Sequence, residues 1–218
     1  MSLILGNDAA WGGWGWCLAT SGGPVRVGHI KLGGRSWPMA SLAAYLRDME
    51  DVLVEGQILQ GADPRPLRVV IEEPPICYSG GERRGVYPEG HPKAGEDIPA
   101  GNQAATGYGL GRIAGAIELW GCRPHLAYPW LIDPGAWRKW WKGRLRGKGR
   151  AAKKQAAVAL VRSEGWGRFL APWPWKGDDG GAVADVAEAI LLAVGAARND
   201  QDAPAGPASW LRVKHRPG

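Results

Sequence analysis

The sequence predicts an α/β fold built on a mixed five-stranded sheet with helices on its faces, and three observations support this. The first 32 residues contain three short apolar segments separated by glycine-containing turns, which is typical of an antiparallel meander. Further along the chain, segments with helical periodicity alternate with short apolar runs, an order that adds strands and packs helices on the sheet. The length of 218 residues is enough for one domain and short for two.

Five segments are expected to form the strands. The first, 2–8, is an apolar run that ends in a polar pair, and turns containing glycine separate it from the second and third. The fourth is rich in β-branched residues and two prolines follow it, whereas Pro129 interrupts the fifth. The expected strands cover residues 2–8, 14–20, 25–32, 68–73 and 125–132.

Five segments are expected to form helices, from apolar residues at helical spacing or from helix start signals. They cover about 38–56, 102–119, 134–142, 151–164 and 182–198. The segment 74–101 is rich in glycine, proline and charge, and so long a loop in a compact domain is usually functional or disordered. We therefore expect one domain over 1–198 and a flexible, basic C-terminal tail over 199–218.

Positive charge is concentrated in one part of the chain. Lysine and arginine number 27 against 21 acids, for a net charge of +6, and the segment 138–154 contains no acid at all. Tryptophans interleaved with this basic run favour a surface that contacts a polyanion over a merely solvated face. The candidate contacts to a nucleic-acid backbone are Arg138, Lys142, Arg144, Arg146, Lys148 and Lys153.

Composition also excludes several classes of protein. No apolar run is long enough to span a bilayer, and the N-terminal residues lack the features of a signal peptide, so we expect a soluble, cytoplasmic protein without a membrane partner. Cys17, Cys77 and Cys122 form no CxxC motif, which argues against a disulfide framework and structural zinc. The four histidines are scattered. If the protein uses a metal, its ligands should therefore be carboxylates.

Four acids occupy positions from which they could act together. Asp8 and Glu72 each end an apolar strand, and parallel pairing of those strands would bring both carboxylates to one edge of the sheet. Asp185 and Glu188 lie three residues apart in an expected helix, on one face beside an apolar stripe. Each acid alone also has an ordinary explanation, as a solvated strand end or as an acid near a helix N-terminus.

A cluster of these carboxylates would need neutralising cations. We expect no cationic side chain beside them, so divalent ions should take that part, and oxygen ligands select Mg²⁺ or Mn²⁺. Two such ions would support hydrolysis of a phosphodiester by a metal-activated water. Asp178 and Asp179 compete with Asp185 as ligands, although residues that precede a helix ordinarily cap it.

The ordered motifs resemble those of the RuvC family of Holliday-junction resolvases, which have the RNase H-like fold. ILGND and the following GWCLAT are similar to the first two strands of that family, VVIEEPP to its fourth strand, and ADVAEAILLA to its terminal helix. The segment from Trp137 to Val158 resembles the family's basic position, glycine-rich connection and Lys-x-Gln helix start. The resemblance covers roughly residues 3–198.

The resemblance implies a homodimeric endonuclease that cuts four-way or branched DNA with two Mg²⁺ or Mn²⁺ ions in each active site. It assigns Arg138 to the family's upstream basic position and Lys153 to a lysine that contacts phosphate and assists catalysis. It makes metal ligands of four acids, namely Asp8, Glu72, Asp185 and Glu188.

Several departures from the family leave junction specificity open. Asp-Ala-Ala follows the first strand where the family has Asp-Pro-Gly, and the last acid is glutamate rather than aspartate. Pro75 lies where the family carries an aromatic that inserts into the junction, a part that Tyr78 or Tyr87 could take. The alternatives are a flap nuclease, a ribonuclease H acting on RNA–DNA hybrids, or a nucleic-acid-binding protein without activity. Actin-like kinases and ATPases share the topology, but they need a second domain that this chain lacks.

Overall fold

The computed structural model describes residues 3–10, 13–31, 67–72, 115–122, 126–147, 149–177 and 180–203, together with most residues between 46 and 58. The strands are β1 (Ile4–Ala10), β2 (Gly13–Thr20), β3 (Gly23–Lys31), β4 (Arg68–Glu72) and β5 (Ala127–Ile132). The helices with printed bounds are α3 (Pro134–Lys139), α4 (Arg150–Ser163), η1 (Gly167–Leu170), α5 (Ala182–Arg198) and η2 (Asp200–Asp202), where η marks a 3-10 helix. Helical residues also occur between 46 and 58 and over 115–121.

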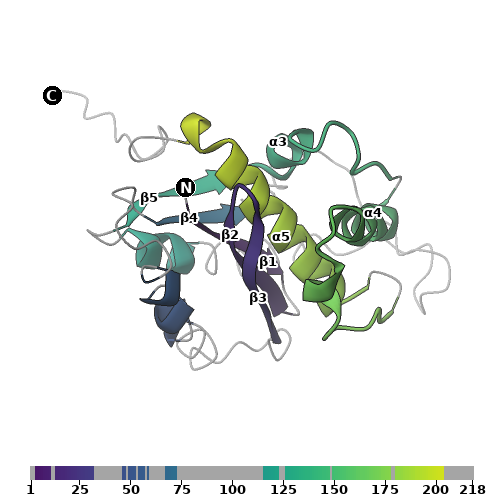
Figure 1. The fold of residues 1–218 in the computed structure, drawn as a ribbon, viewed down its shortest axis with the longest axis horizontal. Coiled ribbons are helices and arrows are strands. Elements are labelled where there is room, and N and C mark those ends of the chain that lie inside the picture. Colours follow the sequence, from purple (N-terminus) through teal and green to yellow (C-terminus); the bar gives the residue numbers. More distant parts are fainter. Residues whose placement is uncertain are drawn as a thin grey trace, which may run out of the picture.

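The strands form one mixed five-stranded sheet in the order β3-β2-β1-β4-β5, which confirms the predicted fold class (Figure 1). β2 pairs antiparallel with β1 and with β3, so the N-terminal meander forms as predicted. β1 and β4 pair in parallel, with Asn7 opposite Ile71, and β5 continues the parallel half. One residue beyond this pair on each strand, Asp8 and Glu72 therefore emerge at the same edge of the sheet.

Alternation along the strands divides the buried residues into two cores, one on each face of the sheet. On one face Ile4 and Val70 pack with α3, α4, α5 and η1. On the other face Leu5 and Val69 pack with the helical residues between 46 and 58 and over 115–121. Because successive side chains of a strand point to opposite faces, Asp8 and Glu72 share the face that α5 covers.

Helix α5 is the central helix of the structure, and Figure 1 shows it running across the strands with α4 beside it. Its residues Val183–Ala197 are all buried, as expected for a helix that is apolar on nearly every side. Its bounds are those that the sequence predicts, and α4 differs from its predicted range by one residue at each end. No helix among the described residues is long and apolar enough to cross a membrane.

Candidate metal centre

Three carboxylates meet where β1 passes under α5. Asp8, Asp185 and Glu188 each offer an oxygen atom that lies within 4.8 Å of those of the other two. All three residues are buried, with between 6% and 8% of their surface exposed. The i,i+3 spacing of the two helical acids places them one above the other on the same side of α5, which faces the end of β1. The structure therefore brings together three of the four acids that the sequence singles out.

The close approach of α5 depends on a glycine in β2. Gly15 pairs with Asp8 on β1, and a Cβ built on Gly15 would lie 2.3 Å from the carbonyl oxygen of Asp185 and 2.7 Å from the nitrogen of Val186. Both of those atoms belong to the backbone of α5, so no side-chain rotation could relieve the contact. The missing side chain at position 15 thus lets the first turn of α5 sit directly on the sheet, with Asp185 beside Asp8.

Glu72, the fourth predicted ligand, lies at the edge of this group and is held by α3. The indole nitrogen of Trp137 donates a hydrogen bond of 2.6 Å to Oε2 of Glu72. Helix α3 begins directly after β5, where Asp133 caps it by accepting hydrogen bonds from the backbone nitrogens of Gly135 and Ala136. This short connection carries Trp137, which the sequence did not single out as a site residue, back over the end of β4.

Two cationic side chains lie inside the acidic cluster, contrary to the expectation that none would. Arg138 stacks on the ring of Trp137 and donates a 2.9 Å hydrogen bond to Oε1 of Glu188, with Oε2 of Glu72 at 3.6 Å. Lys154 donates a hydrogen bond to Oδ1 of Asp185 and lies 3.7 Å from Oε2 of Glu188. The two cations come from α3 and α4, whose place beside the acids could not be read from the chain.

The lysine in the cluster is Lys154, the neighbour of Lys153, to which the resemblance assigns a part in catalysis. Lys153 is exposed, whereas Lys154 is 6% exposed and buried against α5. Consecutive residues of a helix point about 100° apart, so only one of the two can face the acids. The apolar residues Ala157, Val158 and Val161 mark the buried face of α4, and Lys154 continues that face at the turn before them.

A histidine also contacts the cluster. His29 on β3 pairs with Gly15 on β2, and its Nε2 lies 3.2 Å from Oδ2 of Asp185. The two oxygens of Asp185 are thus held from opposite sides, by His29 and by Lys154. The scattering of histidines along the sequence gave no sign of this contact. The register of the β2–β3 hairpin, which places position 29 beside Gly15, is the signal that could have found it.

Burial and mutual repulsion raise the pKa values of two of these acids, whereas hydrogen-bond partners lower the pKa of a third. Burial raises the pKa of Asp8 well above its usual value, and the charges of Glu188, Glu72 and Asp185 raise it further. Burial likewise raises the pKa of Glu72 to about 7, although Arg138 opposes the shift. Burial acts to raise the pKa of Asp185 as well, but the hydrogen bonds from His29 and Lys154 outweigh it and lower that pKa.

The other described cations of the basic segment lie outside the cluster. Lys142, Arg144 and Arg146 are exposed, and Arg144 donates hydrogen bonds to Glu164 and Ser163. Several residues of interest fall outside the described part of the chain: Lys148, Pro75, Tyr78, Tyr87, Asp178 and Asp179. Whether Asp178 or Asp179 contributes a metal ligand therefore stays an untested prediction.

Comparison with solved structures shows which fold this is. RuvC from Thermus thermophilus in complex with a Holliday junction substrate matches with a TM-score of 0.53 and 12% sequence identity, over 92% of this chain and 96% of RuvC. This chain has the RNase H-like fold of RuvC. A second T. thermophilus RuvC structure matches with a TM-score of 0.47 and 15% identity, over 91% of this chain and 95% of that one.

The yeast mitochondrial Holliday junction resolvase Ydc2 matches with a TM-score of 0.45 and 16% identity, over 90% of this chain and 78% of Ydc2. The sequence matches no protein-family model and no curated protein. The likeness to RuvC is therefore one of fold, and the chemistry of the site has to be argued from the residues of this chain.

The donor set of the cluster fits a divalent cation. Carboxylate oxygens are the ligands that Mg²⁺ and Mn²⁺ prefer, and three carboxylates converge here. Arg138 and Lys154 balance two of the four negative charges that the acids carry when all are ionised. Asp8 makes no hydrogen bond or salt bridge with another residue of the described part, so its oxygens remain available to an ion. The buried acidic cluster can thus bind metal ions.

Proposed function

We propose that this protein is a metal-dependent endonuclease that cuts four-way or otherwise branched DNA, with the acidic cluster as its active site. The observation that carries the proposal is the convergence of Asp8, Asp185 and Glu188, from β1 and α5, within 4.8 Å of one another in a buried site. The net charge of +6 fits a polyanionic substrate. The RuvC structure with the same fold contains a Holliday junction substrate, which supports branched DNA as the substrate class.

We infer that Asp8, Asp185 and Glu188 hold the metal, with Glu72 as a fourth ligand at the edge. Two divalent ions bound there would activate a water for attack on the phosphodiester and stabilise the leaving oxygen. The four ionised acids carry four negative charges, of which Arg138 and Lys154 balance two. One divalent ion would balance the remaining two. A second ion would therefore bind best together with the phosphate of the substrate.

The other side chains hold the acids in place. His29 and Lys154 fix the two oxygens of Asp185, so that its carboxylate cannot rotate away from Asp8. Trp137 orients Glu72 in the same way. Arg138 stacks on an aromatic ring with its guanidinium beside two acids, where it can transfer hydrogen bonds from carboxylate to phosphate when DNA enters. Lys154 replaces Lys153 in the assignment of the lysine that assists catalysis.

We also infer that the protein acts as a homodimer. A four-way junction presents two strands for symmetric cleavage, and a pair of subunits related by a two-fold axis matches that symmetry. The exposed cations of the basic segment, among them Lys142, Arg146 and Lys153, would contact the DNA backbone. Their contribution should fall steeply with salt, because each neutralised phosphate releases counterions.

The experiment that tests the proposal is cleavage of four substrates, a four-way junction, a flap, an RNA–DNA hybrid and a linear duplex, with Mg²⁺ and with Mn²⁺. We expect paired nicks in the junction and little cleavage of the linear duplex. Selective cleavage of the hybrid by a monomer would identify a ribonuclease H instead, and selective cleavage of the flap would identify a flap nuclease.

The matched variants for this assay are Asp8→Asn and Glu55→Gln. Asp8→Asn removes a metal ligand from the cluster, so we expect no cleavage while junction binding persists. Glu55→Gln removes an exposed carboxylate that is paired with Arg26 outside the cluster, and it should cleave like the original protein. Metal-dependent nicking by Asp8→Asn at the original rate would remove Asp8 from the mechanism. Junction binding without cleavage by the original protein would instead identify a nucleic-acid-binding protein without activity.

A further inference from the structure

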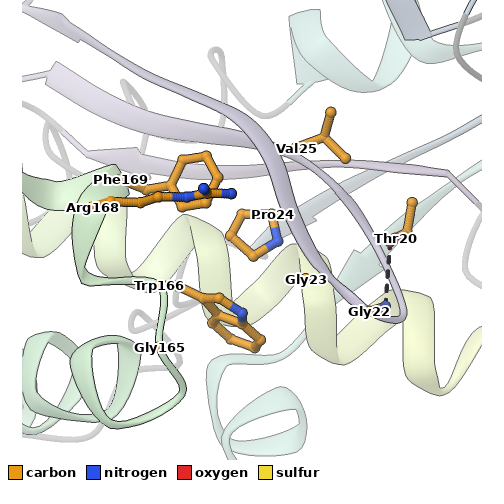
Figure 2. Close-up of a pocket in the computed structure, with 9 residues that line it drawn as sticks. All are labelled: Thr20, Gly22, Gly23, Pro24, Val25, Gly165, Trp166, Arg168 and Phe169. Carbon is orange, nitrogen blue, oxygen red and sulfur yellow. Dashed lines mark hydrogen bonds between the residues drawn. The ribbon is translucent and has the colours of Figure 1, made fainter.

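A second feature with binding chemistry lies at the other end of β2 and β3. The turn between these strands and the segment around η1 border an open pocket of about 310 Å³, which we call the hairpin pocket (Figure 2). It is lined by Thr20, Gly22, Gly23, Pro24, Val25, Gly165, Trp166, Arg168 and Phe169. Thr20 lies five residues along β2 from Gly15, which corresponds to roughly 17 Å at the rise of a strand. The hairpin pocket is therefore separate from the acidic cluster.

The lining of the hairpin pocket combines aromatic rings with one positive charge. Figure 2 shows the side chains of Phe169, Arg168 and Trp166 arranged around Pro24. The guanidinium of Arg168 lies 4.9 Å from the centre of the Phe169 ring, a stacked arrangement that fixes its direction. Among the described residues, no carboxylate lines the pocket and none makes a salt bridge with Arg168. Its donors are thus free to meet an anion.

One of the two aromatic rings of the hairpin pocket, that of Trp166, is held in place by neighbouring residues. Trp166 packs edge-on against Trp141, and the guanidinium of Arg198 lies over the rings of both tryptophans. A Cβ on Gly23 would lie 2.9 Å from the indole nitrogen of Trp166, so the hairpin fits closely against this ring. The ring therefore keeps its position before any ligand arrives, which lowers the entropy cost of binding.

We propose that the hairpin pocket binds one nucleotide of a single-stranded segment of DNA. A base would stack on the aromatic rings of the pocket, those of Phe169 and Trp166, and the phosphate of its nucleotide would accept hydrogen bonds from Arg168. This combination of aromatic rings and a cationic groove is how proteins hold single strands without reading their sequence. A duplex hides the faces of its bases, so a strand near a branch point, where bases are unstacked, is the form that fits.

The test is fluorescence anisotropy of a short labelled oligothymidylate, measured on the full chain in EDTA over a range of salt concentrations. Phe169→Leu keeps apolar bulk but removes the ring, and we expect roughly 5- to 150-fold weaker binding, the range for one base stacked on an aromatic ring. Arg168→Gln should weaken binding as well and reduce the slope of log affinity against log salt by about 0.7, the value for one phosphate contact on a single strand.

Arg162→Gln is the matched control, because it removes an exposed arginine of α4 that does not line the hairpin pocket. It should change neither the affinity nor the salt slope, and near-ultraviolet circular dichroism should show all three variants folded. Equal affinity of all three variants for the oligonucleotide would overturn the proposal. So would tighter binding of a short duplex than of the single strand, or full competition by free thymidine monophosphate at the same nucleotide concentration, which would identify a small-molecule site.

Because these measurements are made without divalent ions, they do not depend on the acidic cluster. A protein that fails to cut branched DNA could still bind the oligonucleotide in the hairpin pocket. A protein that cuts branched DNA could equally fail to bind it there. The two proposals therefore stand or fall on different observations.

Discussion

The two faces of strand β2 differ in the size of the side chains that they present. Toward α5 the strand carries small residues, among them Gly15 and Ala19, whereas the opposite face carries the large side chains of Trp14, Trp16 and Leu18. Both faces are buried, so burial alone does not separate them. The small face lets a helix backbone come close to the sheet, and the large face fills a core with side-chain bulk.

This difference explains why the acids gather on one side only. A helix that packs on glycine and alanine approaches closely enough for short carboxylates on its first turns to reach a carboxylate on the neighbouring strand. A helix held away by tryptophan could not bring them together. The α5 face should therefore control metal binding, and the opposite face should control stability alone. The following predictions test that division.

The largest loss of stability is expected on the opposite face. Trp14 is fully buried, and Trp14→Ala should lower the free energy of unfolding by about 3–5 kcal/mol, the usual cost of removing a large aromatic side chain from a core. Calorimetric titration with Mn²⁺ at a temperature where the variant is folded should still show binding. Loss of Mn²⁺ binding in the folded variant would mean that the two faces are not independent.

A somewhat smaller loss is expected when Lys154 is replaced. Lys154→Met leaves the buried carboxylate of Asp185 without its cation, which should cost about 3 kcal/mol, the low end of the range for breaking a buried pair. Nearby carboxyls can take up a proton and limit the cost. Lys153→Met is the control, because the exposed neighbour should change stability by no more than about 0.5 kcal/mol.

Urea denaturation of both lysine variants with and without Mn²⁺ gives the comparison. Removal of a positive charge beside the acids should make Mn²⁺ restore more stability to Lys154→Met than to Lys153→Met. Equal changes in stability and in the response to Mn²⁺ for the two variants would contradict the assignment of Lys154, rather than Lys153, to the cluster.

A moderate loss of stability with complete loss of the site is expected for Gly15→Ala. Its Cβ would overlap the backbone of α5, so the helix must move, at a cost of about 1–3 kcal/mol. Gly28→Ala is the matched control on the other face, where the added Cβ would meet only the ring of Trp16. Both variants should be destabilised, but only Gly15→Ala should fail to bind Mn²⁺ in calorimetric titration. Binding by Gly15→Ala with unchanged affinity would refute the role of the close approach.

The elements and their order could be predicted from the sequence because local patterns determine them. The glycine-containing turns and apolar runs indicated five strands, and the apolar pattern of 182–198 indicated α5 with its final bounds. The placement of Asp8 and Glu72 was predicted only on the condition that the first and fourth strands pair in parallel, which they do. Such features follow from the periodic pattern of apolar residues along the chain and from the rules by which strands of a sheet are connected.

The contacts of the cations and the histidine with the acids could not be predicted, because the packing of distant elements places these side chains. Arg138 reaches the acids through the cap of α3, and His29 reaches Asp185 through the register of a hairpin. Lys153 and Lys154 differ only in which side of α4 packs on α5, and their adjacent positions carry no local mark of it. A resemblance to a family motif cannot decide by itself which of two adjacent lysines faces the acids.

The smallest expected effect concerns pH, and it depends on the two acids whose pKa values are raised, Glu72 and Asp8. The folded-state pKa of Glu72 is about 7, against 4.5 for an ordinary glutamate exposed to water, and the pKa of Asp8 is also raised. A raised pKa favours folding while the group is protonated, so this stability is complete below pH 4.5 and is lost as pH rises through about 7. The metal-free protein should therefore lose stability over that window.

Metal binding should show the opposite dependence on pH, because the ligands must lose their protons first. The rise in melting temperature caused by Mn²⁺ should be larger at about pH 8 than at about pH 6, which lie above and below the pKa of Glu72. Glu72→Gln should weaken this dependence, since one of the titrating groups is gone. Glu164→Gln, which removes a carboxylate paired with Arg144 outside the cluster, should leave it unchanged. Metal-free stability that increases between pH 5 and about 7 would contradict the raised pKa values and would show that the cations of α3 and α4 already neutralise the whole cluster.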